Sequence, residues 1–334
     1  MTLARELIAH IASNGPLTVA EYIARCNAHY YATRDPLGMQ GDFTTAPEIS
    51  QIFGELVGAW VADQWQKTGA PQALLCEAGP GRGTLMKDAL RATWHVKGFH
   101  DAVAIRLIET SPQLRAKQQE TLLNAHPLIH WAETFDELPP LPLFFIANEF
   151  FDALPTEQYV REKLELTQRR VDHDGTNFVF KPPGEVVRET SDVSCVIMRK
   201  LAAHIHRHGG AALIVDYGYD GVEQTDTLQA VKKHGYADPL QTPGEADLTT
   251  HVDFAALIQT ARQSGAHAFG AVTQGTFLKR LGAELRATAL CRQADPEQQK
   301  AILSGLERIA GPHEMGELFK VIAVTSSHDK PAGF

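Results

Sequence analysis

One stretch decides the fold: Leu74-Leu75-Cys76-Glu77-Ala78-Gly79-Pro80-Gly81-Arg82-Gly83-Thr84-Leu85. Its apolar start predicts a buried strand, and its three glycines at alternate positions predict a tight turn. The residues after the turn continue to Arg91 with the spacing of a helix. A side chain at any of the three glycines would block a close ligand or require a costly positive φ. Because the first N–H groups of the helix lack partners within the helix, we expect the turn to bind an electronegative ligand.

Two classes of nucleotide ligand are bound by such a turn. Dinucleotide-binding turns have the pattern G-x-G-x-x-G, in which the third glycine lets the helix pack closely on the strand. That position is Thr84 when counted from Gly79 and Met86 when counted from Gly81, so the dinucleotide pattern fails. The pattern present, E-x-G-x-G-x-G, resembles the first motif of S-adenosylmethionine-dependent methyltransferases. A purely structural strand–helix turn is the alternative.

The composition is that of a globular protein with one large domain and insertions, or with two domains. The chain has 334 residues, of which 44% are hydrophobic and 21% charged. Its net charge of −9, with no run of Lys or Arg, argues against nucleic acid as the main partner. No apolar run approaches the length of about 20 residues that crosses a membrane, so we expect no membrane insertion.

The cysteines and the N-terminus bear on metal binding and location. The four cysteines form no C-x-x-C pair and none lies near a histidine at zinc-ligand spacing, so we expect no metal site. Scattered cysteines suit a reducing compartment. The first residues lack the apolar core of a signal peptide and the acid-poor character of a transit peptide. These features together predict a cytoplasmic protein.

Strands and helices alternate along most of the chain, which predicts an α/β fold with a doubly wound sheet. In such a sheet, ligands bind beyond the carboxyl ends of the strands. Glu77, Glu109 and the pair Asn148-Glu149 all stand at predicted strand ends, so we expect them to line one site. The predicted strands begin at Leu74, Val103, Ile129, Leu143, Gly210, Ala266 and Leu318.

The periphery of this sheet is predicted in three parts. Residues 1–66 form an N-terminal helical region with a loop over the site, residues 67–334 form the core, and an insertion occupies about 156–190. The helix from Ile49 onward has one apolar face, which places Glu55 on the opposite, solvent side. The segment Pro239 to Asp253 is predicted as a loop, and residues 328–334 as a frayed tail.

Two residues are candidates for the nucleoside. A carboxylate at Glu109, the end of the second strand, can accept both hydroxyls of a ribose, although a solvated loop acid is the alternative. Trp131, at the end of the third strand, is placed to stack on an adenine or to fill the core.

The stretch Asn148-Glu149-Phe150-Phe151-Asp152-Ala153-Leu154-Pro155 suggests the acceptor of the reaction. If its turn is helical, Glu149 and Asp152 share one face. Two carboxylates facing a methyl donor suit the forked donors of a guanidinium, and direct displacement needs line-up more than acid–base relay. Alternatively, Glu149 only contacts the cofactor and Asp152 caps a helix.

Taken together, these stretches resemble the MidA family of S-adenosylmethionine-dependent methyltransferases, whose mitochondrial members are complex I assembly factors that methylate an arginine. The resemblance runs through nearly the whole chain. Besides the turn and the Asn148–Pro155 stretch, it is carried by residues 41–56, 211–218, 243–249 and 276–278.

The resemblance implies a class I methyltransferase core, a Rossmann-like sheet with an N-terminal helical extension and an insertion after the fourth strand. It implies S-adenosylmethionine as cofactor, a protein arginine as acceptor, and a respiratory complex I subunit as partner. Glu149 resembles the first acid of the double-glutamate loop of arginine methyltransferases, with Asp152 as candidate second acid. A non-catalytic assembly factor and a small-molecule methyltransferase are the alternatives. The cofactor residues implied are Phe43, Thr44, Glu77, Gly79, Gly81, Gly83, Glu109, Trp131 and Asn148.

Overall fold

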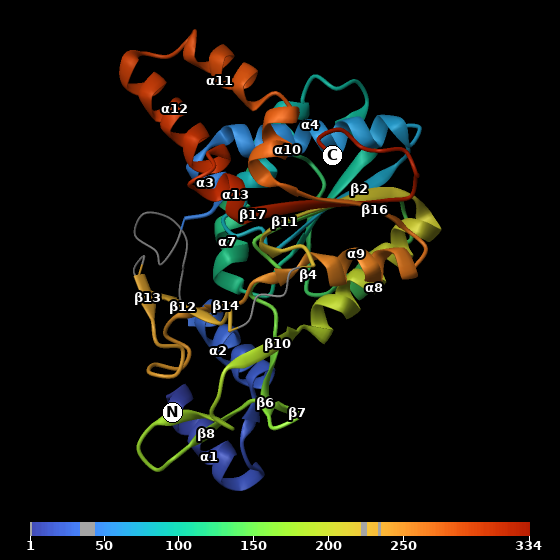
Figure 1. Ribbon diagram of the computed structural model, residues 1–334. Helices are drawn as coiled ribbons and strands as arrows, with labels where there is room; N and C mark the ends of the chain where they lie inside the picture. Colours follow the sequence, from blue (N-terminus) through green and yellow to red (C-terminus); the bar gives the residue numbers. More distant parts are fainter. Residues whose placement is uncertain (1, 34–43, 222–225, 233–234) are drawn as a thin grey trace.

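The computed structural model describes residues 2–33, 44–221, 226–232 and 235–334. Its centre is a twisted sheet with helices on both faces (Figure 1). The eight strands of this sheet are β2 (Ala73–Ala78), β3 (Val103–Ile108), β4 (Ile129–Ala132), β5 (Leu143–Asn148), β11 (Gly210–Tyr219), β15 (Val252–Asp253), β16 (His267–Thr273) and β17 (Phe319–Thr325).

The strand order confirms the predicted doubly wound α/β fold. Along the sheet it is β16-β17-β11-β5-β2-β3-β4, and β15 pairs with β11. Strand β17 runs antiparallel to both of its neighbours, and the other pairs are parallel. The chain order reverses at β2, which lies between β3 and β5. A crevice for a ligand therefore opens beyond the carboxyl end of β2.

Each face of the sheet has its own hydrophobic core. Strand β5 is buried on both faces, as its continuous apolar run predicts. Because successive side chains point to opposite faces, Phe144 belongs to one core and Phe145 to the other. The first core is covered by α4 (Gln51–Lys67), α5 (Thr84–Thr93), α10 (Gln274–Arg280), α11 (Ala283–Cys291) and α12 (Pro296–Ala310), and the second by α8 (Asp192–His208) and α9 (Phe254–Gln263).

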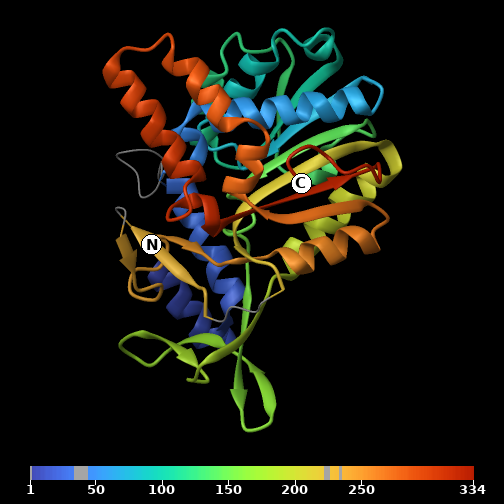
Figure 2. The same ribbon diagram turned by 45° about the horizontal axis from the view of Figure 1, so that its top comes forward.

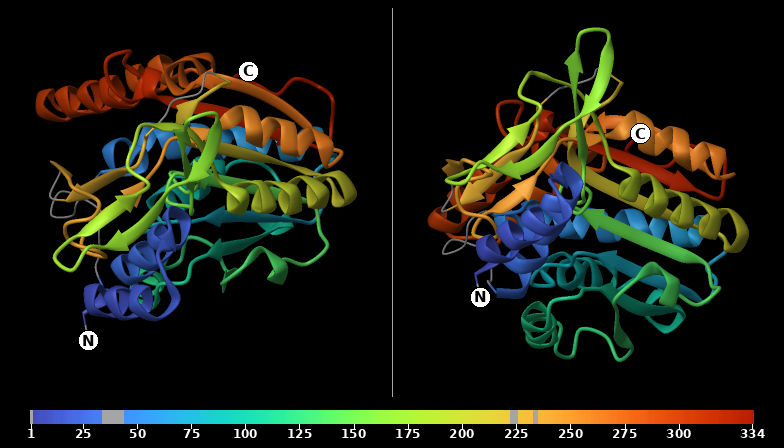
Figure 3. Two further views of the ribbon diagram at one scale, coloured as in Figure 1. Left: turned by 60° about the horizontal axis from the view of Figure 1, so that its bottom comes forward. Right: turned by 90° about the horizontal axis from the view of Figure 1, so that it is seen from below.

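A smaller lobe lies below the sheet in Figures 1 and 2. Its core joins α1 (Leu3–Asn14) and α2 (Val19–Thr33) to Val171 of the insertion and to Leu248. In both views of Figure 3, α1 and α2 lie against the strands of this lobe. The strands of this lobe are β1 (Leu17–Thr18), β6 (Glu157–Glu162), β7 (Glu165–Gln168), β8 (Arg170–His173), β9 (Phe178–Lys181), β10 (Val186–Thr190), β12 (Gln229–Lys232), β13 (Gly235–Ala237) and β14 (Asp247–Thr249).

The division of the chain into an N-terminal region, a core and an insertion stays a prediction. Hydrophobic contacts cross its first boundary. The insertion predicted at about 156–190 contains five strands, β6 to β10. Helix α4 precedes the predicted boundary at residue 66, yet it packs on α5 within the core of the main sheet. Hydrophobic packing therefore runs across that boundary, whereas α1 and α2 pack with the insertion.

Glu55 does not lie on the solvent side of its helix as predicted. It is 4% exposed and forms ion pairs with Arg91 at 2.7 Å and with Arg286 at 2.7 Å. Burial raises the pKa of Glu55, but the hydrogen bonds and charges of the two arginines outweigh it, so the pKa lies below its usual value. The apolar pattern of one helix gave no sign of arginines arriving from α5 and α11.

Two further expectations about local structure were wrong. The tail at residues 328–334 is not frayed at its end, because Phe334 packs against Phe277 and the Ala332 carbonyl accepts a hydrogen bond from Trp60 Nε1 at 3.1 Å. The segment Pro239 to Asp253 is not a plain loop, because it contains β14 and β15. Its glycine and threonine content hid strands that are fixed by tertiary pairing.

The close contact between α4 and α5 gives a stability prediction. A Cβ atom on Gly58 would lie 2.6 Å from Ala89 Cα and 2.7 Å from Ala89 O. Helix propensity alone favours Ala over Gly by about 1 kcal/mol. We expect overpacking to outweigh it, so that Gly58→Ala lowers the unfolding free energy by about 1–3 kcal/mol in urea denaturation. Ala59, the exposed neighbour of Gly58, provides the control. Ala59→Gln should change the unfolding free energy by less than about 0.5 kcal/mol. Equal stability of both variants would contradict this packing.

Candidate active site

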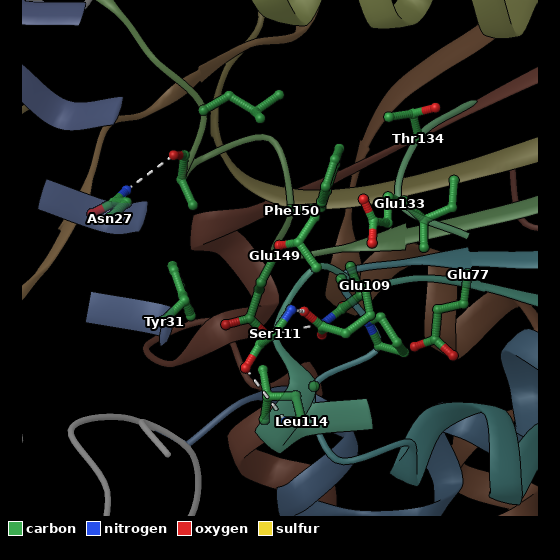
Figure 4. A pocket seen from close by; sticks show the side chains of 18 of the residues that line it. Asn27, Tyr31, Glu77, Glu109, Ser111, Leu114, Glu133, Thr134, Glu149 and Phe150 are labelled. Carbon is green, nitrogen blue, oxygen red and sulfur yellow. Dashed lines mark hydrogen bonds between the residues drawn. The ribbon is translucent and has the colours of Figure 1, made fainter. Parts of the chain in front are cut away.

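A cavity of about 660 Å³ opens at the carboxyl ends of β2, β3 and β5, which is within the usual size range of ligand pockets. Glu77, Glu109, Glu133 and Glu149 stand around it, with Tyr31 on the α2 side (Figure 4). The cavity thus lies at the strand ends, where the sequence predicts a ligand site. Other residues of its wall are Asn27, Thr45, Pro47, Glu48, Gly79, Gly81, Arg82, Thr84, Ser111, Thr134, Phe135, Asn148, Phe150, Leu154, Ile197 and Lys200.

The glycine turn forms one wall of the cavity. Gly79, Gly81 and Gly83 have φ angles of 60°, 52° and 82°, a region that L side chains rarely adopt. A Cβ atom on Gly79 would lie 3.1 Å from Phe150 Cδ2. Gly79 and Gly81 line the cavity, whereas Gly83 directly precedes α5 and sets the turn from outside the lining.

A buried glutamine connects the turn to the predicted ribose acid. Gln118, in α7 (Pro112–Thr121), donates from Nε2 to the Gly81 carbonyl at 2.7 Å and to Glu109 Oε2 at 3.2 Å. The other oxygen of Glu109 accepts a hydrogen bond from the Ser111 N–H at 2.8 Å. The pKa of Glu109 lies above its usual value, because burial raises it more than these hydrogen bonds lower it. The carboxylate of Glu109 is thereby held in a fixed position at the cavity wall.

Two predicted cofactor residues, Trp131 and Thr44, do not line the cavity. Trp131 is not part of the cavity wall: its Nε1 donates to Gln118 Oε1 at 2.7 Å, so it orients Gln118 from behind. Thr44 is described but does not line the cavity, whereas its neighbour Thr45 does. Phe43 lies outside the described residues.

Glu77 supplies a buried carboxylate without a partner. It is 3% exposed and lines the cavity, and its Oε2 has no hydrogen bond among the described residues. Burial raises the pKa of Glu77 to about 8. An unpaired carboxyl group at such a place is suited to a ligand that brings positive charge, because a cation would compensate the cost of burying the carboxylate.

Glu149 stands at the opposite side of the same crevice. Its φ of 50° is unusual for a residue other than glycine, and such backbone strain concentrates at functional sites. Its Oε1 accepts hydrogen bonds from Asn148 Nδ2 at 3.0 Å and from the Ala46 N–H at 3.3 Å. Burial, followed by the charge of Asp152, raises the pKa of Glu149 to about 8.

Asp152 is close to Glu149 but does not line the cavity. It is 6% exposed, and its Oδ1 has no partner among the described residues. Burial raises the pKa of Asp152 above its usual range, against a hydrogen bond to the Tyr217 side chain that lowers it. The structure therefore brings the two acids together without placing both of them at the cavity wall.

Asp216, a buried residue within β11, holds this acidic turn. Its Oδ2 accepts hydrogen bonds from three consecutive N–H groups, those of Phe150, Phe151 and Asp152, at 2.9 to 3.2 Å. Asp216 was not among the residues predicted for the site. Its role is set by β11 pairing beside β5, which brings Asp216 to the loop that follows β5.

Of the loop that was predicted to lie over the site, the structure describes the part from Thr44 onward. Residues 46–49 form the short helix α3 (Ala46–Ile49). Glu48 Oε1 accepts a hydrogen bond from Thr84 Oγ1, and Ala46 N–H donates to Glu149, so α3 joins the cofactor turn to the acceptor side. The part of the predicted loop from Gly41 to Phe43 lies outside the described residues.

Other residues of the site were not predicted. Glu133 follows β4 and lines the cavity, and the rule that acids follow the strand ends would have found it. Gln118 and Tyr31 lie on helices far from the strand ends in sequence, and nothing in the sequence pattern pointed to them.

The described residues contain neither a metal-binding group of side chains nor a membrane-spanning helix. Within the described ranges, no group of three or more His, Cys, Asp or Glu side chains is arranged to hold a metal ion. No helix in the same part of the chain combines the length and the apolar character of a membrane span.

Residues 56–272 match a family described as putative S-adenosyl-L-methionine-dependent methyltransferases. The chain belongs to this methyltransferase family. The mitochondrial protein arginine methyltransferase NDUFAF7 homolog of Drosophila melanogaster is 37% identical over 97% of this chain and 84% of the relative. The human protein arginine methyltransferase NDUFAF7 is 35% identical over 96% of this chain and 82% of the relative.

A solved structure supports the same assignment for the methyltransferase. A protein from Burkholderia thailandensis with S-adenosyl-homocysteine bound superposes with a TM-score of 0.85 and 28% identity. The match covers 99% of this chain and 93% of that chain. The family, the fold and S-adenosylmethionine as cofactor are thus confirmed.

The predicted cytoplasmic location is contradicted by the same comparisons. The relatives from Drosophila melanogaster, Danio rerio and humans are all named as mitochondrial proteins. Cysteine spacing and the character of the first residues were therefore insufficient grounds for a location.

The site of the methyltransferase fits S-adenosylmethionine on its own geometry. Gly79 leaves room where a Cβ atom would meet Phe150, Glu77 Oε2 has no hydrogen bond among the described residues, and two hydrogen bonds hold the Glu109 carboxyl group at the cavity wall. S-adenosylmethionine supplies a methyl group on a cationic sulfur, whose cleavage leaves a neutral thioether. The residues of this site need only hold that methyl group in line with an acceptor.

The ribose assignment gives a binding prediction. We expect Glu109→Gln to weaken S-adenosylmethionine binding about 10- to 100-fold in calorimetric titration, because hydrogen bonds to a charged group contribute about 1.5–3 kcal/mol. Glu120→Gln changes an exposed carboxylate of the nearby helix α7 and should leave the dissociation constant unchanged. Unaltered affinity in Glu109→Gln would remove Glu109 from the nucleoside site.

Proposed function

We propose that this methyltransferase transfers the methyl group to a guanidinium nitrogen of a protein arginine. The observation that carries the proposal is Glu149, a carboxyl group with a raised pKa that faces the cavity one strand away from the glycine turn. A buried carboxyl group of this kind is suited to a cation. The names of the relatives from Drosophila melanogaster and humans, which are protein arginine methyltransferases, support the same acceptor.

In this proposal Glu149 binds the substrate directly. Both of its protein hydrogen bonds go to the same oxygen, Oε1, and among the described residues none goes to Oε2. The Glu149 carboxylate can therefore accept N–H groups of a guanidinium in a charge-assisted pair. Asp152 is the proposed second acid and acts from behind, because its negative charge adds to the demand for a cation at Glu149.

The geometry of neighbouring strands orients the reaction. Ala78, the last residue of β2, pairs with Ala147 of β5, so Gly79 lies beside Asn148, the last residue of β5. A nitrogen lone pair held at Glu149 can attack the methyl carbon while the electron pair of the breaking C–S bond goes to sulfur. The nitrogen gives up a proton, which the Glu149 carboxylate can accept, and line-up is the main contribution of the protein.

The cofactor residues remain part of the proposal. We assign Glu77, Gly79, Gly81, Gly83 and Glu109 to S-adenosylmethionine, supported by the burial, φ angles and hydrogen bonds given above. Thr44, Trp131 and Phe43 stay predictions, and Trp131 contributes through Gln118 rather than by stacking. A respiratory complex I subunit as the methyl acceptor likewise stays a prediction, because it depends on the family resemblance alone.

One substitution distinguishes an enzyme from a non-catalytic assembly factor that only docks a partner. We expect Glu149→Gln to lose at least about 100-fold in methyl release to an arginine-containing protein, since the charge-assisted pair is lost, while S-adenosylmethionine binding stays within about threefold. The measurement is transfer of a radioactive methyl group, with respiratory complex I subunits as candidate acceptors. Glu162→Gln, on an exposed strand of the insertion, is the control.

Each other result of this assay has a clear meaning. Methylation of small molecules but not of proteins by the wild type would favour a small-molecule methyltransferase. No methylation of any acceptor would favour a non-catalytic assembly factor. Full activity in Glu149→Gln would contradict the proposed role of Glu149.

The raised pKa of Glu149 predicts a pH dependence. Below pH 8 the carboxyl group is mostly protonated and accepts a cation poorly, and above pH 8 it is ionised. We therefore expect kcat/KM for the protein substrate to rise as the pH increases from about 6, to reach half of its maximum near pH 8 and to level off above about pH 9, because kcat/KM reports the ionisation of the free enzyme. Glu149→Gln should lack this rising limb. A wild-type profile that falls over the same interval would contradict the assignment.

A further inference from the structure

Asn148 has an unpaired group in the cavity wall that the roles given so far do not use. It is the last residue of β5 and is 8% exposed. Its Nδ2 donates to Glu149 Oε1 at 3.0 Å, whereas its Oδ1 has no hydrogen-bond partner among the described residues. Buried polar atoms are rarely left unpaired, so a free carbonyl oxygen at a cavity indicates a ligand that donates a hydrogen bond.

The orientation of this amide is set by its neighbour. If the amide were reversed, Asn148 Oδ1 would face Glu149 Oε1, which already accepts the Ala46 N–H, and in the ionised form that binds a cation both groups would be hydrogen-bond acceptors. The donor end of Asn148 is therefore committed to Glu149, and the acceptor end is left for the ligand.

The place of Asn148 points to the methyl acceptor rather than to the cofactor. It follows the residue that pairs with Ala78, so it stands beside Gly79 on the adjacent strand, about 5 Å away. It also precedes Glu149 directly. Asn148 thus lies between the turn that binds the cofactor and the acid that binds the substrate, where the nitrogen that is methylated has to be.

We propose that Asn148 is a further acceptor-binding residue, whose Oδ1 accepts an N–H of the guanidinium that Glu149 binds. The inference rests on the proposed function. A neutral acceptor beside a charged one fixes the plane of the guanidinium without adding repulsion between carboxylates. Two acceptors on different residues also match the planar fork of a guanidinium better than the single point charge of an ammonium. The sequence pattern had assigned Asn148 to the cofactor.

The test uses a small probe, so it requires no identified protein substrate. The protein is saturated with S-adenosyl-homocysteine and titrated with ethylguanidinium chloride, with n-butylammonium chloride as the comparison cation. We expect the wild type to bind ethylguanidinium more tightly than n-butylammonium. Asn148→Ala should weaken ethylguanidinium binding about tenfold or more, because a hydrogen bond to a charged donor is lost. Its affinity for S-adenosyl-homocysteine should stay within about twofold of wild type, given that the lost contact is to the acceptor.

Two variants guard against an effect of folding alone. Asn148→Ser keeps a hydroxyl acceptor and should bind ethylguanidinium with intermediate affinity, and it decides the question if Asn148→Ala does not fold. Gln274 is also a buried amide, with Nε2 bonded to the Ile309 carbonyl at 2.7 Å and Oε1 without a partner among the described residues, but it lies outside the cavity wall. Gln274→Ala should therefore keep both affinities.

The results that would overturn the inference differ from those that would overturn the proposed function. If the wild type does not bind ethylguanidinium, the proposed acceptor fails and Asn148 loses its role with it. If the wild type binds and both Asn148 variants bind equally well, only the role of Asn148 fails. If Asn148→Ala loses affinity for S-adenosyl-homocysteine instead, Asn148 serves the cofactor and the inference is wrong.

Discussion

The site depends on one buried carboxylate, that of Asp216. Its Oδ2 accepts three consecutive backbone N–H groups of the turn after β5, and its Oδ1 accepts the N–H of Tyr217. These hydrogen bonds hold a turn that begins with Glu149 at a positive φ, a conformation that costs free energy and persists only when its surroundings fix it. Because β11 and β5 are neighbours in the sheet, the fold itself brings Asp216 to this turn.

The smaller lobe also holds the turn that follows β5, through Asn27 of α2. Asn27 of α2 donates to the Ala153 carbonyl at 3.0 Å and to the Leu248 carbonyl at 2.8 Å, and it accepts a hydrogen bond from the Leu248 N–H at 3.1 Å. A single side chain thus joins α2, the acidic turn and β14. The helix α3 adds the contact from Ala46 to Glu149. Helices α2 and α3 therefore help to hold the turn that carries Glu149.

The sequence predicted well those features that depend on local pattern. The strand–turn–helix unit at Gly79, the seven main strands and the acids at Glu77, Glu109 and Glu149 all follow from periodicity and from glycine chemistry. It failed where long-range contacts decide. Glu55 is buried because arginines from two other helices reach it, and the chain end is ordered because Phe334 packs on Phe277.

The same distinction explains the errors in the site. Trp131 was expected either to stack on the adenine or to fill the core, and it packs against the core behind the cavity wall, with a hydrogen bond to Gln118 of α7. Asp152 was expected to share a face with Glu149, and the turn instead directs it toward Tyr217. Neither outcome can be derived from spacing along the chain, because each depends on a partner more than ten residues away.

The central claim is that the Glu149 carboxyl group requires a guanidinium as its partner. The most direct measurement is the pKa of Glu149, followed by carbon-13 NMR of labelled glutamate and assigned by its loss in Glu149→Gln. In protein loaded with S-adenosyl-homocysteine, the account predicts a pKa near 8 that falls when ethylguanidinium is added. A pKa near the usual value of a glutamate, unchanged by the cation, would contradict it.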